Sequence, residues 1–170
     1  GYGQAIIFQR NFGGLNAWGE FTYVGASNSQ PGDNFGHSVA IAGDTMVIGS
    51  PYSFGRGAAY VFQKMGTENW VETKILHASD LQENDAFGMS VAVGGDTIVV
   101  GADGEDGGTG DLLPEAGAAY VFQRNQDGAD AWGEVAILHA SDAQADDWFG
   151  GAVAISGDTI VVGATNEDGG

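Results

Sequence analysis

Short apolar runs with the composition of β-strands recur along the chain and are separated by glycine-rich, acidic turns. One set consists of FGMSVAV (87–93), DTIVVGA (96–102), GAAYVFQ (117–123) and ILHAS (137–141). The first run alternates small and apolar residues, while the others are rich in β-branched and aromatic residues, which are typical of strands. No segment shows a sustained helical period. The pattern therefore predicts an all-β fold with almost no helix.

The same set of segments occurs three times, so the chain is built from internal repeats. Three kinds of residue mark the repeat at matching spacings: Phe35, Phe87 and Phe149; Asp44, Asp96 and Asp158; Trp18, Trp70 and Trp132. The first two strands of each repeat are joined by Gly-Asp, a pair suited to a tight hairpin turn because a positive φ costs glycine nothing. Units of four short strands predict the blades of a β-propeller, in which neighbouring sheets bury each other's faces.

Each repeat also carries a pair of short motifs. Phe-Gly opens one strand and a Val-Gly or Ile-Gly motif closes the next, at Phe35 with IGSP (48–51), Phe87 with VGAD (100–103) and Phe149 with VGAT (162–165). GAAYVF follows in two of the three copies, and the first copy reads GQAIIF. This arrangement resembles the FG-GAP repeat, the blade unit of the integrin α-subunit head and of many secreted bacterial proteins. The resemblance covers essentially the whole chain and implies propeller blades of four antiparallel strands.

The blade order that this resemblance implies makes the chain circularly permuted. It would begin with the third and fourth strands of a blade, continue with two whole blades, and end with the first and second strands of another. We treat 1–170 as a single repeat domain, with repeats at about 1–56, 57–116 and 117–170. Three repeats are too few for a closed ring of four to eight blades. Two explanations remain open: a window of a longer propeller, or copies that complete each other's half-blades into a ring or fibre.

The charge balance narrows the classes of partner. There are 23 Asp and Glu residues against 5 Lys and Arg, a net charge of −18. Nucleic acids and anionic membrane surfaces need basic patches, so we expect neither as a partner. No apolar run is long enough for membrane insertion, and the chain has no cysteine to form disulfides. The family resemblance implies an extracellular setting, secreted or at the cell surface.

Acidic loops offer the oxygen ligands that Ca²⁺ prefers. The connections between the first two strands are too short to wrap a cation, so the calcium loops of integrins do not carry over. A longer loop, DGEDGGTGD (103–111), offers Asp103, Glu105, Asp106 and Asp111 as metal ligands. A second candidate set is Asp80, Asp85, Asp142 and Asp147. The alternative for the long loop is a solvated surface. The alternative for Asp85, Asp147 and the equivalent Asp33 is a side chain that caps backbone N–H groups at a turn.

Catalysis finds little support in the sequence. His77 and His139 stand at equivalent repeat positions, which argues for a role in the blade, and neighbouring residues of HASD point to opposite faces of a strand. We therefore expect no enzyme. Trp148 has no aromatic counterpart in the other repeats, where Asn34 and Ala86 stand, so it is a candidate for contact with a ligand.

These observations predict a non-enzymatic extracellular module for recognition or adhesion, with a protein or glycan ligand and with calcium assisting. One alternative is a structural protein that assembles head to tail through its half-blades into a ring, fibre or sheath. Another is the non-catalytic propeller segment of a larger secreted enzyme.

Overall fold

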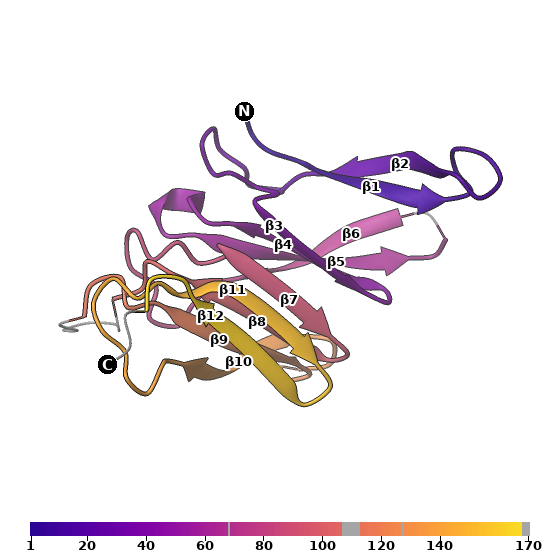
Figure 1. The fold of residues 1–170 in the computed structure, drawn as a ribbon. Coiled ribbons are helices and arrows are strands. Elements are labelled where there is room, and N and C mark those ends of the chain that lie inside the picture. Colours follow the sequence, from indigo (N-terminus) through magenta and orange to yellow (C-terminus); the bar gives the residue numbers. More distant parts are fainter. Residues whose placement is uncertain (68, 107–112, 127, 168–170) are drawn as a thin grey trace.

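A computed structural model describes residues 1–170 except 68, 107–112, 127 and 168–170. In this described part, twelve strands form four antiparallel sheets that lie side by side (Figure 1). The only helical element there is a 3-10 turn, η1 (Ser53–Gly55). The all-β prediction is confirmed, and none of the described residues forms a helix that is long and apolar enough to cross a membrane.

Two of the sheets are complete blades of four strands. Blade 1 consists of β3 (Ser38–Ala42), β4 (Thr45–Ser50), β5 (Ala58–Met65) and β6 (Asn69–Leu76), in that spatial order. Blade 2 consists of β7 (Ser90–Gly94), β8 (Thr97–Ala102), β9 (Ala118–Arg124) and β10 (Trp132–Leu138). Sequential strands pair throughout, as the repeat pattern predicts.

The other two sheets have two strands each. The N-terminal half-blade is β1 (Ala5–Arg10) with β2 (Trp18–Val24), and the C-terminal half-blade is β11 (Phe149–Ser156) with β12 (Thr159–Ala164). By alignment of the repeats, the first holds the third and fourth strands of a blade and the second holds the first and second. The predicted half-blades on either side of the two complete blades are therefore confirmed, and the four sheets of the described residues do not close into a ring.

The Gly-Asp connections form two-residue hairpins. Ala42 pairs with Thr45 across the first turn, and the equivalent residues pair across the other two. Gly43, Gly95 and Gly157 have φ values of 57°, 57° and 56°. A positive φ at the first central residue is what a type II′ turn requires, which explains why glycine stands there in every repeat.

The hydrophobic core is divided among the spaces between neighbouring sheets. Between blades 1 and 2, Phe87 is fully buried beside Tyr120 and Phe122, with edge-to-face ring centroids 5.3 and 6.1 Å apart. Phe35 has the same contacts with Tyr60 and Phe62 next to the N-terminal half-blade. The repeated phenylalanines thus fill the space between blades, as the sequence predicts.

Near the inner strands, consecutive blades approach through their backbones. The Ser38 hydroxyl donates to the Gly88 carbonyl at 2.8 Å. A Cβ atom added to Gly49 would collide with that same carbonyl oxygen. Ser90 and Gly101 repeat this arrangement against the carbonyl of Gly150. Gly49 and Gly101, the glycines of the first two such motifs, are therefore required where the next blade presses on them.

Candidate functional site

The connections β4–β5, β6–β7 and β10–β11, together with the described residues of β8–β9, gather at one end of the blades, opposite the Gly-Asp hairpins (Figure 1). A cleft of about 260 Å³ lies among them, which we name the loop-end cleft. Its lining residues are Tyr52, Asn84, Ala86, Met89, Asp103, Gly104, Glu115 and Trp148. These residues come from blade 1, blade 2 and the start of the C-terminal half-blade, so stacking of three sheets creates the cleft.

Two aromatic side chains of the cleft are accessible to a ligand. Tyr52 follows β4 and is 50% exposed, and Trp148 directly precedes β11 and is 41% exposed. Large exposed rings beside a polar cleft offer flat apolar surfaces for a sugar, an aliphatic stem or a cation. The prediction that Trp148 contacts a ligand remains untested, but its place in this cleft makes it available for that role.

Trp148 is held in an unusual backbone conformation. Its φ is 57°, in the left-handed region that a bulky residue rarely adopts. Its backbone N–H donates to the Glu115 carbonyl at 3.1 Å, and its indole Nε1–H donates to the Glu115 carboxylate at 3.0 Å. Asn34 and Ala86 occupy the equivalent positions with φ of 57° and 58°. The turn thus demands this conformation in all repeats, and two bonds to Glu115 fix the tryptophan within it.

The cleft is acidic. Asp103 and Glu115 line it, and its lining contains no Lys or Arg. Burial raises the pKa of Asp103, the negative charge of Glu115 raises it further, and His37 nearby acts in the opposite direction. When a cation binds beside such a carboxylate, it stabilises the charged form, because it offsets both the desolvation and the repulsion that raise the pKa.

The acidic residues before each Phe-Gly pair close tight turns. The carboxylate of Asp33 accepts the Gln30 backbone N–H at 2.8 Å, and Asp147 accepts that of Gln144 at 2.6 Å. Asp85 accepts the backbone N–H of Gln82 in the same way. All three aspartates are buried. Burial is the main cause that raises the pKa of Asp85, and the Gln82 N–H partly offsets it. These contacts are the capping of backbone N–H groups that is the alternative to metal binding for these three aspartates.

The remaining candidate metal ligands differ in their surroundings and contacts. Glu105 is buried, Asp106 accepts the Glu115 backbone N–H at 2.8 Å, and Asp80 accepts the Tyr120 hydroxyl at 2.9 Å. Asp142 is exposed, and Asp111 lies outside the described residues. Among the residues that are described, no three His, Asp or Glu side chains form a group that could hold a metal ion.

Sequence reasoning missed Tyr52 and Glu115 as parts of a site. Tyr52 follows the IGSP motif, and Glu115 stands just before the GAAYVF motif. Neither position carries a signal of its own. The available signal was that both residues depart from the repeat. Asp103, at the position equivalent to Pro51, and Trp148 are also non-repeated residues at this end of the blades.

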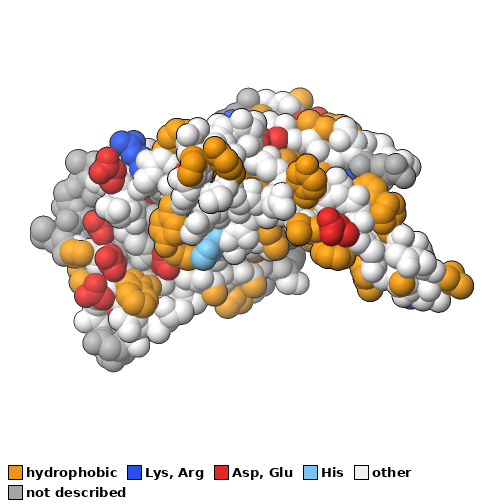
Figure 2. Space-filling model, turned by 90° about the horizontal axis from the view of Figure 1, so that it is seen from above, with side chains coloured by type: hydrophobic (Ala, Val, Ile, Leu, Met, Phe, Trp, Pro, Cys, Tyr) orange, Lys and Arg blue, Asp and Glu red, His pale blue; other side chains and the backbone are white. Residues whose placement is uncertain are grey.

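The surface around the cleft is negatively charged, like the cleft itself. In the face shown in Figure 2, carboxylates gather toward the loop end of the molecule, while hydrophobic side chains extend over the rest. A ligand that approaches the loop end therefore meets a negative field before it reaches the cleft.

Comparison with known proteins identifies the repeats. The sequence profile of the FG-GAP repeat matches residues 18–62, 70–122 and 132–170. Each matched region begins at one of the repeated tryptophans, and the first two extend into the GAAYVF strand of the next sheet. A search of curated proteins finds no match. With most of its length matched in three consecutive copies and its strands arranged as propeller blades, the chain belongs to the FG-GAP repeat family.

Proposed function

We propose that this chain is a non-enzymatic recognition module of the extracellular space, which binds a positively charged group of a protein ligand in the loop-end cleft. The observation that carries the proposal is the composition of the cleft: two carboxylates, Asp103 and Glu115, beside two exposed aromatic rings, Tyr52 and Trp148. The rigid blades serve as the scaffold that holds these loop residues in place.

The chemistry of the cleft suits a lysine or arginine side chain. Its aliphatic stem packs on an aromatic ring, and its cationic head meets the carboxylates and the ring face. Such a contact becomes stronger when the group is partly withdrawn from water, and the partial burial of Asp103, which raises the pKa of its carboxyl group, provides such surroundings. The net charge of −18 adds attraction at long range, which accelerates the encounter with basic ligands.

The test measures binding of short peptides that contain arginine or lysine, followed by the fluorescence of the protein's tryptophans. Matched peptides with citrulline or acetyl-lysine report the contribution of charge. We expect the charged peptides to bind at least tenfold more tightly than the matched ones, and Glu115→Gln or Trp148→Ala to remove this difference. Asp44→Asn, at the opposite end of the blades, is the control and leaves binding unchanged.

Two results would contradict the proposal. Equal binding of charged and matched peptides would remove the role of the carboxylates. Binding of neutral oligosaccharides in place of peptides would identify the aromatic rings as a sugar platform and the ligand as a glycan.

Calcium assistance remains a prediction. The described carboxylates of the 103–111 loop do not converge, and Asp111 is not among the described residues. The test is to remove metal ions with a chelator and then to measure the melting temperature of the protein without added metal, with Ca²⁺, and with Mg²⁺ as the control. A specific rise with Ca²⁺ that Asp106→Asn abolishes would support it, and identical melting in all three conditions would refute it.

A further inference from the structure

We propose that two copies of this polypeptide join through their half-blades: the free edge of β12 in one copy pairs with the free edge of β1 in the second. Among the strands of the described residues, β12 pairs only with β11, and β1 pairs only with β2. Together the two sheets hold the four strands of one blade in the correct order. The inference concerns the sheet edges and is independent of the ligand proposed for the loop-end cleft.

The complete blades fix the register of this pairing. In blade 1, Met46 pairs with Phe62 and Val47 with Val61, and blade 2 repeats the register with the equivalent residues. Transferred by repeat alignment, Ile160 pairs with Phe8 and Val161 with Ile7 of the second copy. The remaining pairs follow in sequence: Thr159 with Gln9, Val162 with Ile6, Gly163 with Ala5.

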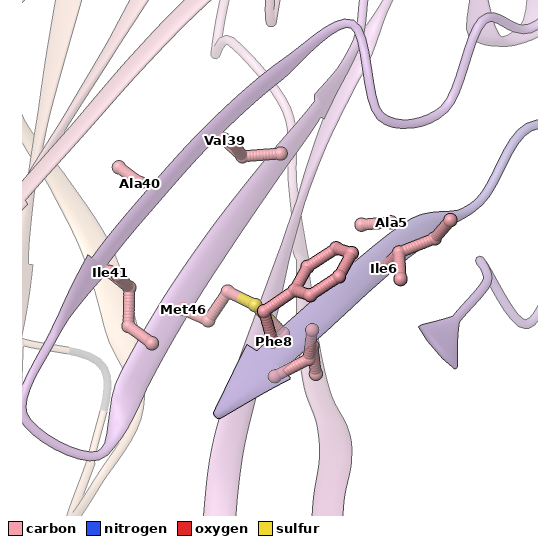
Figure 3. A pocket seen from close by; sticks show the side chains of 8 residues that line it. Ala5, Ile6, Phe8, Val39, Ala40, Ile41 and Met46 are labelled. Atoms are coloured by element: carbon pink, nitrogen blue, oxygen red, sulfur yellow. The ribbon is translucent and has the colours of Figure 1, made fainter. Parts of the chain in front are cut away.

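A groove lies beside β1, where a complete blade has its first and second strands. It is lined by residues of β1, β3 and β4, and in Figure 3 the Phe8 ring lies close to Met46 while Val39 and Ile41 extend from the same face of β3. In the intact part of the stack, β7 of blade 2 lies against β3 and β4 of blade 1, and β11 lies against β7 and β8. The β11–β12 hairpin of a second copy would take the corresponding place in the groove.

Exposed apolar residues mark both surfaces of the proposed contact. Val39 at the groove is 61% exposed, whereas its blade 2 equivalent Val91 is 8% exposed. Phe8 on β1 is 55% exposed, whereas its equivalent Phe62 is 3% exposed. On the opposite edge, Val161 is 63% exposed. Its equivalent in blade 2, Val99, is fully buried. Each exposed residue thus has a buried counterpart wherever the neighbouring strands are present.

An ion pair within blade 2 predicts a matching ion pair between the two copies. In blade 2, Arg124 Nε lies 3.0 Å from the carboxylate of Asp96. The equivalent residues are Arg10 on one half-blade and Asp158 on the other, so pairing would bring opposite charges together. This pair is among the few basic contacts available to a chain that has 5 Lys and Arg residues in all.

A second polar contact links neighbouring blades. Ser79 donates its backbone N–H and its hydroxyl to the Glu134 carboxylate at 3.0 and 2.6 Å, and Ser27 does the same with Glu72. The next serine in the series is Ser141, and its glutamate partner would be Glu20 of the second copy.

Two copies contribute four complete blades and two composite blades. A six-bladed ring lies within the four to eight blades that propellers commonly have, so a closed dimer is the expected assembly. The closed ring leaves no sheet edge of this kind exposed, which removes a hazard of aggregation.

The experiment is sedimentation equilibrium of the polypeptide 1–170 over a concentration series at physiological salt, where the like charges of the copies are screened. We expect a dimer of the 17.4 kDa chain. Val161→Asp should weaken it about 100-fold because it places a charge in the composite core. Arg10→Glu or Asp158→Arg alone should weaken it about tenfold, and the double variant should restore it.

Asp44→Arg is the matched control, since it makes the same change at the equivalent turn of a complete blade and should leave the dimer intact. Circular dichroism of each variant verifies that the monomer is folded. A folded wild-type monomer at every concentration would overturn the proposal and leave flanking strands of a longer chain as the occupants of both edges. A dimer that neither charge variant weakens would overturn the register.

Discussion

Trp132 and Trp18 stand at the same position of the repeat, yet Trp132 is 2% exposed and Trp18 is 69% exposed. Trp132 belongs to the core between blades 1 and 2, where the Arg124 guanidinium lies 4.8 Å from its ring centroid. Trp18 lies in a sheet of two strands, and the described residues before that sheet form no blade that could cover its ring. The difference shows that burial in this protein is a property of the junction between blades, since the same residue is core or surface according to its neighbours.

The strongest test of this comparison is removal of the phenylalanine at two junctions. Phe87→Ala should cost about 3–5 kcal/mol of unfolding free energy because the ring is fully buried between two complete blades. Phe149→Ala, at the start of the C-terminal half-blade, should cost roughly half as much because its ring is only partly buried. Urea denaturation measures both. Equal losses would mean that the half-blade packs as tightly as a complete one.

The tryptophans provide the next test. Trp132→Ala should lower the free energy of unfolding by about 3 kcal/mol, whereas Trp18→Ala should change it by less than about 0.5 kcal/mol. Both variants are compared by denaturation at concentrations where the wild type is monomeric. A large loss for Trp18→Ala in the monomer would contradict the exposure of its ring.

A smaller effect is expected for the serines that bridge blades. Ser79→Ala removes the 2.6 Å bond to Glu134 and should cost about 1 kcal/mol. Ser141→Ala, at the equivalent position next to the C-terminal half-blade, should leave the stability of the monomer unchanged and weaken self-association. The two readouts, thermal melting and sedimentation, separate these outcomes. Loss of monomer stability in Ser141→Ala would show that its partner lies within one chain.

The smallest expected effect is the pH dependence of stability caused by Asp103. It distinguishes the cleft from the equivalent region of blade 1, where Pro51 occupies the matching position. Because the pKa of Asp103 is raised above 3.8, the folded state binds its proton more tightly than the unfolded state. Its contribution to stability is therefore fully present at low pH and is lost as the pH rises through the folded pKa. Asp103→Asn should be more stable than the wild type at neutral pH and lose this advantage in acid. A variant less stable at neutral pH would refute this, as measured by melting across pH.

The strands, hairpins and blade order could be predicted because they depend on local features that recur. The Gly-Asp turn needs a positive φ at Gly43, and the same pair recurs at Gly95. A motif that recurs predicts the hairpin more firmly than a single copy does. The β-branched run before each Val-Gly motif likewise specifies a buried strand whichever blade holds it. The permuted halves followed from the order of the same segments along the chain.

The exposure of individual residues and the composition of the cleft could not be predicted in the same way. Trp18 and Trp132 have similar sequence contexts, and their burial differs because a neighbouring sheet covers only the ring of Trp132. The sequence groups Asp103 with Glu105 and Asp106, its neighbours along the chain. The fold instead places it with Glu115 and Trp148, because loops of successive blades meet at the end of the stack.

The close approach of backbones at Gly49 and Gly101 has a consequence for how such a protein can lengthen or shorten. The contact involves a glycine and a serine of one repeat and a carbonyl oxygen of the next, so side chains that differ among repeats do not set the distance between inner strands. A repeat inserted or deleted as a whole brings its own glycine and its own carbonyl. Duplication of the gene segment for one repeat therefore preserves the blade spacing, while the loop residues of the added copy are free to diverge.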